Sequence, residues 1–175
     1  MSNTLLFLLT AIAITITIQL MDLYSGIKTL HIISATILFG TGMGTAFFMF
    51  RSMFTDNMHE KLYAVRNTVL ADYIFTLPAG IIQPMTGFWL IWNLGYSPFE
   101  FWLILTYALY IIALICWLPV VWIQIQLKNI LIECDRTNSP LPIRYHRMFK
   151  IWFWLGWPAF IGLVGIFYLM VTKPS

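Results

Sequence analysis

Five long apolar runs, separated by short polar segments, dominate the sequence. They cover Thr4–Met21, Ser25–Phe50, Asn67–Trp92, Phe101–Leu127 and Phe149–Thr172. Each is close to or longer than the ~20 residues that an α-helix needs to cross a bilayer core. The pattern therefore predicts an all-α, polytopic membrane helical bundle with five transmembrane helices. We expect a single integral membrane domain over residues 1–175, with an N-terminal helix over 1–22 and a four-helix core over 23–175.

Local signals place some of the helix boundaries and bends. Asn57 followed by Glu60 is typical of a helix cap, so we expect the third helix to begin in water and to run straight into the membrane. Pro78 and Pro84 each remove a helix hydrogen bond, and we expect them to bend that helix. The Ser139–Pro142 stretch predicts a break before the last helix.

The composition agrees with a membrane protein. The chain is 60% hydrophobic and only 10% charged, whereas soluble domains carry roughly 25% charged residues. The formal net charge of +3 is small and scattered, which argues against a nucleic-acid partner. Cys116 lies in an apolar run and Cys134 in a polar loop, so we expect neither a disulfide nor a cysteine metal site. No phosphate-binding, nucleophile or paired-carboxylate motif is present.

Basic residues predict the orientation in the membrane. Two of the connections contain most of them: Arg51, Lys61 and Arg66 lie around the second, and Lys128, Arg136, Arg144, Arg147 and Lys150 around the fourth. The third connection has no Lys or Arg. Because cytoplasmic loops are enriched in basic residues, we expect these two connections to be cytoplasmic. This orientation places the N-terminus in the cytoplasm and the C-terminus outside.

His31 is an ionisable group within a predicted span. It lies six residues inside the outer end of its helix, or roughly 9 Å deep. A small, partly polar face that includes Ser34 surrounds it, so we expect the ring to point into protein. One interpretation is an axial ligand to haem or another metal; the alternative is a hydrogen bond to a Ser, Thr or Tyr of another helix. Gly40 and Gly44 lie on the opposite side and predict close packing with a second helix.

Several side chains are expected at the depth of His31. They are Gln83, Met85 and Thr86 of the third helix and Tyr107 of the fourth. Met85 is either a soft second metal ligand or a packing residue, and Gln83 and Thr86 are candidates for hydrogen bonds across helices. Lys28 lies near the outer surface, where it could pair with a haem propionate. These residues form a candidate cofactor pocket.

Asp72 is the second ionisable group expected inside the membrane, about 9 Å from the inner end of the third helix. A buried carboxylate needs a cation or a set of hydrogen-bond donors. The partners expected at that end are the cations Arg51, Arg147 and Lys150 and the amides Gln124 and Gln126. Asp72 is either part of a structural ion pair or a proton carrier.

Four stretches together resemble an uncharacterised bacterial family of predicted integral-membrane proteins, a domain of unknown function. They are LHIISATILFGTGMGTAFFMFR, LADYIFTLPAGIIQPMTGFWL, CWLPVVWIQIQLKNI and RYHRMFKIWFWLGWPAFIGLVGIFYLMVTKP. The resemblance extends from Leu23 to Pro174. It implies a multi-pass protein of the bacterial inner (cytoplasmic) membrane, in which the orientation predicted from the basic residues places the C-terminus in the periplasm, and it implies no established activity.

The chain is also faintly similar to HemJ-type protoporphyrinogen oxidases and CopD-type copper-resistance membrane proteins. The similarity lies in the Lys28-Thr29-Leu30-His31 arrangement, in Pro78 and Gly87, and in the terminal Lys173-Pro174 pair. It implies binding of haem b through His31. The sequence departs from those oxidases where FEFWLILTYALY lacks their lysine and where Arg51-Ser52-Met53 replaces a histidine-bearing end. The similarity therefore favours porphyrin binding over protoporphyrinogen oxidation.

Three functions follow from these observations. The leading hypothesis is a membrane-embedded haem-binding or electron-transfer protein, an oxidoreductase of HemJ-like type at most, with haem b near the outer side. Its second ligand would be Met85 or the His31 of another protomer in a homodimer. The alternatives are a small transporter or permease for a metal ion or metabolite that uses Asp72 and His31, and an accessory subunit of a larger membrane complex that packs through Gly40 and Gly44.

Overall fold

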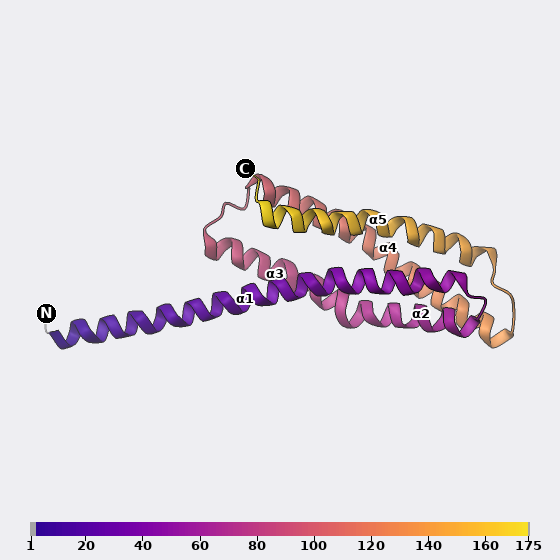
Figure 1. The fold of residues 1–175 in the computed structure, drawn as a ribbon, viewed down its shortest axis with the longest axis horizontal. Coiled ribbons are helices and arrows are strands. Elements are labelled where there is room, and N and C mark those ends of the chain that lie inside the picture. The colour runs from indigo at the N-terminus through magenta and orange to yellow at the C-terminus, as the bar shows by residue number, and fades with distance from the viewer. Residues whose placement is uncertain (1–2, 175) are drawn as a thin grey trace.

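The computed structural model describes residues 3–174 and is helical throughout, with no β-strand in that range (Figure 1). The elements follow in the order α1 (Asn3–Arg51), η1 (Ser52–Phe54), α2 (Met58–Ala71), η2 (Asp72–Thr76), α3 (Leu77–Leu94), α4 (Phe101–Thr137) and α5 (Ile143–Thr172). The prediction of an all-α bundle is confirmed. The two short elements are a 3-10 turn and a π-turn, respectively.

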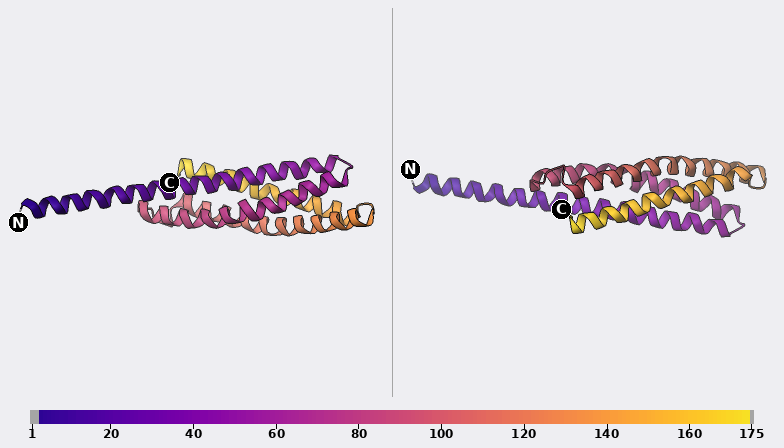
Figure 2. Two further views of the ribbon diagram at one scale, coloured as in Figure 1. Left: turned by 90° about the horizontal axis from the view of Figure 1, so that it is seen from below. Right: turned by 90° about the horizontal axis from the view of Figure 1, so that it is seen from above.

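Two helix pairs form the bundle: α4 with α5, and α1 with the continuous α2–η2–α3 segment. The pairs are joined by α2, which packs against α4. Both pairs lie along the same long axis in Figures 1 and 2. The main core lies at the end with the α1–α2 and α4–α5 connections, where Val65, Leu127 and Tyr145 are completely buried. This core packs one end of the bundle tightly, and a cavity lies between the two helix pairs further along the bundle.

The first two predicted helices form one continuous helix. α1 extends for 49 residues, about 74 Å at 1.5 Å per residue, so the predicted break at residues 22–24 is wrong. No proline interrupts the chain there, and helical hydrogen bonding continues. The N-terminal part of α1 projects beyond the other helices in all three views (Figures 1 and 2).

Four helices in the described part of the chain are long and apolar enough to cross a membrane. They cover Gln19–Phe54, Met58–Leu94, Phe101–Thr137 and Ile143–Thr172. These helices correspond to the predicted four-helix core. Most side chains of the predicted span Thr4–Met21 lie outside the described ones, so a fifth span stays a prediction.

The α2–η2–α3 segment begins with the predicted cap. The Asn57 side-chain oxygen accepts hydrogen bonds from the backbone N–H groups of His59, at 2.9 Å, and Glu60, at 3.4 Å. Further along, the N–H of Leu77 bonds to the carbonyl of Asp72, which closes a π-turn just before Pro78. Proline cannot donate a backbone hydrogen bond, so the wider turn accommodates it without ending the helix. The irregularity expected from proline therefore precedes Pro78, and α3 continues through Pro84.

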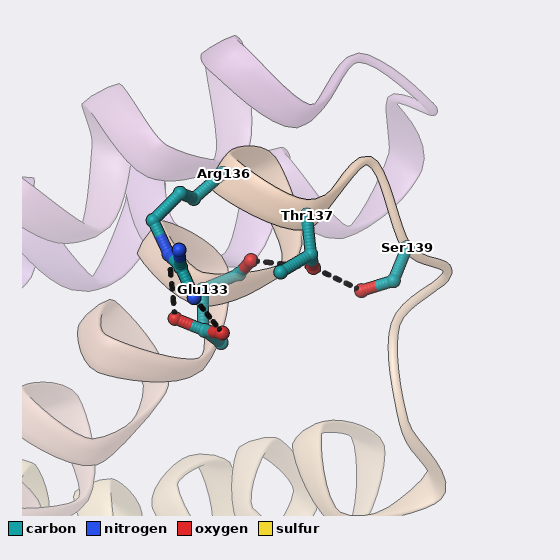
Figure 3. Close-up of polar contacts among 4 residues, drawn as sticks. All are labelled: Glu133, Arg136, Thr137 and Ser139. Atoms are coloured by element: carbon teal, nitrogen blue, oxygen red, sulfur yellow. Dashed lines mark hydrogen bonds and ion pairs between the residues drawn. The ribbon is translucent and has the colours of Figure 1, made fainter.

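Local polar contacts end α4 at the predicted break (Figure 3). The guanidinium group of Arg136 donates two hydrogen bonds to the Glu133 carboxylate, at 2.7 and 3.1 Å. The Thr137 hydroxyl donates to the Glu133 carbonyl at 2.8 Å and lies 2.8 Å from the Ser139 hydroxyl. Asn138 adopts a left-handed conformation with φ of 54°, which terminates helices because the next residue can no longer extend the hydrogen-bond ladder.

Candidate functional site

His31 is hydrogen-bonded through both ring nitrogens. Its Nδ1 atom lies 2.8 Å from the hydroxyl oxygen of Thr86, and its Nε2 atom lies 3.1 Å from the side-chain nitrogen of Gln83. Ser34 completes the group by donating to the side-chain oxygen of Gln83. The residues come from α1 and α3, so the group fastens these two helices together. This is the interhelical hydrogen bond expected as the alternative to metal ligation.

The hydrogen-bond pattern determines the tautomer of His31. The Thr86 hydroxyl donates to the Ile82 carbonyl at 2.8 Å, so its oxygen is left to accept a proton from Nδ1 of His31. The amide of Gln83 donates to Nε2, which must therefore be unprotonated. In this tautomer the ring is neutral, and the lone pair of Nε2 accepts a hydrogen bond from Gln83. A β-carbon at Gly87 would lie 3.2 Å from the His31 ring, so the small residue leaves space for the imidazole.

The other residues of the candidate cofactor pocket do not join this group. Met85 is 67% exposed, and Lys28 is exposed with its Nζ 5.8 Å from the ring centroid of Tyr24. Tyr107 packs on Phe88 at 5.6 Å between centroids, and its hydroxyl has no hydrogen-bond partner in the described structure. Among the described side chains, no three His, Cys, Asp or Glu residues converge in a metal-binding group.

Gly40 and Gly44 do not bring two helices of this chain together. A β-carbon added at either position would meet no other atom within 4 Å. The expected close approach occurs instead between α4 and α5, where a β-carbon at Gly165 would lie 3.0 Å from Leu109 and one at Gly162 would lie 3.5 Å from the Leu109 carbonyl. The small-xxx-small spacing was therefore a wrong guide to packing within the described chain, because spacing alone does not say which helix face has a neighbour.

A cavity of about 700 Å³ lies between the two helix pairs. This volume falls within the range of small-molecule binding sites, roughly 300–1,000 Å³. α1, α3 with η2, α4 and α5 all contribute to its wall. Its surface is almost entirely apolar, and Asp72 is the one charged residue among the described residues that line it. The space is a candidate binding site for a largely apolar molecule.

Polar atoms without hydrogen-bond partners gather at one place in this cavity. Asp72, Thr76, Trp117 and Gln124 all line it, and Thr76, Trp117 and Gln124 lie beside the Asp72 carboxyl. Nevertheless Oδ2 of Asp72, Oγ1 of Thr76, Nε1 of Trp117 and Oε1 of Gln124 are buried without a partner. Each such atom costs about 1–3 kcal/mol unless a ligand or water satisfies it.

Asp72 has no basic partner in the part of the chain that the structure describes. Its side chain is only 5% exposed, and the ion pairs found among the described residues are His59–Asp135 and Arg136–Glu133. Arg147 and Lys150 are exposed, and Arg51 instead lies over the ring of Phe54 at 6.0 Å. The expected cationic partners are therefore not engaged, whereas the expected proximity of Gln124 is found.

Sequence reasoning missed two residues of this group, Thr76 and Trp117. Both follow helical spacing that could have revealed them. Thr76 comes four residues after Asp72, and Trp117 comes seven before Gln124, so each pair shares one helix face. Trp152 of α5 also lines the cavity with an indole N–H that has no partner. Tryptophan in a membrane helix is common at interfaces and in packing, so the residue type alone does not predict an inward-facing donor.

These features define a polytopic α-helical integral membrane protein with a polar cluster inside its bundle. Comparison with protein families agrees: residues 25–174 match the family described as predicted integral membrane protein (DUF2269), and the chain belongs to that family. No curated protein and no solved structure matches the chain. The match confirms the prediction of an uncharacterised membrane family, and the similarity to HemJ-type and CopD-type proteins stays a prediction.

Proposed function

We propose that this protein binds or carries a lipid-soluble organic cation, with Asp72 as its counter-ion. The observation that carries the proposal is a carboxylate, 5% exposed and unpaired by any cation of the described chain, in the wall of an otherwise apolar cavity. Isolated buried charge is costly, and polar groups inside membrane proteins are commonly functional for that reason. A monocation entering the cavity would neutralise Asp72 and bury its own apolar body.

The aromatic lining supports a cationic ligand. Eight of the lining residues are aromatic: Phe39, Phe50, Tyr110, Trp117, Trp152, Phe153, Trp157 and Phe160. Ring faces attract cations by about 0.5–2 kcal/mol each, and tryptophan is the strongest. No Lys or Arg is found among the described residues of the wall, so an anionic head group would meet no cation there and would be repelled by an ionised Asp72. The transport alternative from the sequence is therefore the one that this cavity favours.

Haem binding through His31 is a hypothesis from the sequence that no observation tests, and it would require the hydrogen bonds of His31 to rearrange. Ligation at Nε2 would break the hydrogen bond from Gln83, and His31 is not among the residues that line the cavity. The donor set near the cavity is Asp72, Thr76, Gln124 and two indoles, which suits an organic cation better than a haem iron.

We further propose the orientation predicted from the basic residues. The end of the bundle with the α1–α2 and α4–α5 connections would lie at the cytoplasmic side of a bacterial inner membrane, following the positive-inside rule. In this orientation the C-terminus lies in the periplasm, and Asp72 lies in the half of the membrane nearer the cytoplasm.

Paired ions of opposite charge test the cation proposal. Tetraphenylphosphonium and tetraphenylborate have nearly the same size and shape but opposite charge. Binding of each is measured by equilibrium dialysis against the full-length protein in lipid nanodiscs, with empty nanodiscs as the background. The variants are Asp72→Asn and, as a matched carboxylate control, Asp56→Asn, because Asp56 is exposed in the α1–α2 connection.

We expect saturable binding of the phosphonium to the wild type and to Asp56→Asn, a loss of at least tenfold in affinity for Asp72→Asn, and no saturable binding of the borate. Equal binding of both ions, or unchanged phosphonium affinity in Asp72→Asn, would contradict the proposal. Saturable binding of a neutral long-chain alcohol, but not of the phosphonium, would show that the polar cluster recognises a hydroxyl group instead.

A further inference from the structure

We infer that the cavity opens sideways into the bilayer through a window between α1 and α5, in the half of the membrane nearer the α1–α2 connection. Two aromatic pairs frame this window. Phe39 stacks on Phe160 with centroids 5.3 Å apart, and Phe50 stacks on Phe153 at 5.4 Å. All four rings also line the cavity. This inference rests on the proposed function only for the identity of the molecule that passes through the window.

Small residues edge the window between the two aromatic pairs. Gly42 and Ala46 of α1 and Gly156 of α5 line the cavity. A β-carbon at Gly42 or at Gly156 would meet no other atom within 4 Å, so open space lies beside both glycines. Gly42 and Ala46 are also exposed. These residues line the cavity and remain accessible, as residues at the edge of an opening do.

Counting along α5 gives the depth of the window. Thr172 ends the helix at the side opposite the α1–α2 connection. Phe160 is twelve residues and Phe153 nineteen residues from that end, which correspond to about 18 and 28 Å. A hydrocarbon core of about 30 Å that starts near the end of α5 places the window in the far leaflet. In the proposed orientation this is the cytoplasmic leaflet, the same depth range as Asp72.

The window is long enough for a molecule that contains an aromatic ring to pass. Phe153 and Phe160 are seven residues apart, or about 10 Å along α5, and Phe39 and Phe50 are eleven apart, or about 16 Å along α1. A molecule dissolved in the inner leaflet would meet aromatic faces first and then the Asp72 cluster at the cavity wall. Access from lipid removes the need to bring an apolar molecule through the water-facing ends of the bundle.

Gly40 provides a matched control for Gly42. Both glycines are exposed on α1 with no neighbour within 4 Å, but only Gly42 lines the cavity. The probe is a nitroxide on Thr45→Cys, a residue on the cavity wall, with native Cys116 and Cys134 replaced by Ser and Ala. Collision rates with oxygen, which concentrates in lipid, and with a water-soluble nickel chelate are measured in nanodiscs without any ligand.

We expect collisions with oxygen to exceed those with nickel several-fold, to fall at least threefold in Gly42→Trp, and to stay unchanged in Gly40→Trp. Gly156→Trp, on the other edge, gives the same decrease and covers the case in which Gly42→Trp does not fold. Equal access for nickel, or equal effects of the Gly40 and Gly42 variants, would overturn the window. Because no ligand is present, this result stands apart from any failure of tetraphenylphosphonium to bind.

Ligand kinetics supply a second measurement on the same variants. If the window is the route, Gly42→Trp slows association of tetraphenylphosphonium at least threefold, whereas Gly40→Trp, at a position that does not line the cavity, leaves the association rate unchanged. A higher Kd at an unchanged association rate would mean that the indole fills the cavity rather than the route, and it would overturn the inference.

Discussion

Nδ1 of His31 and Oγ1 of Thr86 lie 2.8 Å apart and join α1 to α3 across 55 positions of sequence. Interhelical hydrogen bonds in membrane proteins contribute about 0.6 kcal/mol on average and up to ~1.7 kcal/mol. We therefore expect His31→Ala and Thr86→Val each to lower the free energy of unfolding, and the double variant to lose less than the sum. Reversible unfolding in mixed detergent micelles measures the coupling; strictly additive losses would mean that the bond contributes nothing to stability.

The same bond bears on haem. Because both ring nitrogens of His31 are engaged, we expect protein purified from haem-replete cells to show no Soret absorption. The control is His31→Ala, which should give an identical visible spectrum. A Soret band present in the wild type and absent from the variant would instead establish His31 as a haem ligand.

Asp72→Asn tests whether the buried carboxylate serves function rather than stability. The substitution removes a buried carboxyl group that has no basic partner in the described chain, so we expect the unliganded variant to unfold at the same or higher free energy, by up to about 2 kcal/mol. Thermal unfolding in nanodiscs without ligand measures this change. A clear loss of stability would point to a structural partner for Asp72.

Lys61 stabilises the connection between α1 and α2 through hydrogen bonds to its backbone. Its side chain is 7% exposed, and its ammonium group donates to the carbonyls of Ser52, at 2.9 Å, and Met53, at 3.5 Å. Lys61→Met leaves these carbonyls without that donor, and we expect a loss of about 1–3 kcal/mol. Arg66→Met removes an exposed basic residue of the same helix and should change stability by less than about 0.5 kcal/mol. Similar losses in both variants would contradict this role.

Substitutions at two glycines test packing within the chain and packing between chains, respectively. A β-carbon at Gly165 would lie 3.0 Å from a methyl group of Leu109, so a leucine there must displace that side chain, and we expect Gly165→Leu to cost about 1–3 kcal/mol through overpacking. Gly40 has open space beside it, and Gly40→Leu should leave the stability of the protein unchanged. Unfolding curves compare the two, and analytical ultracentrifugation in detergent shows whether Gly40→Leu alters association. A loss of stability that is independent of protein concentration in Gly40→Leu would contradict the described packing.

Much of the fold could be predicted from hydrophobic runs, because a bilayer imposes length and composition on any helix that crosses it. The helix cap at Asn57 and the break at Ser139–Pro142 were also predictable, since both depend on chemistry within a few residues. The break expected between Met21 and Ser25 was wrong because Asp22, Leu23 and Tyr24 include no proline or glycine that would stop a helix. No helix of the described chain packs at Gly40 and Gly44, so close packing there with another subunit stays a prediction, because spacing does not identify a neighbour.

The sequence by itself determined that this chain is a helical membrane protein, where most of its helices begin and end, and that His31 and Asp72 are the ionisable groups to explain. Only the tertiary structure decided their roles. His31 meets Gln83 and Thr86 and is satisfied, whereas Asp72 faces a cavity beside Trp117 and Gln124 with an oxygen left unpaired. The physical reason is that a polar side chain in an apolar bundle is defined by its partners. Those partners come from helices far away in sequence, so their identity depends on how the helices pack.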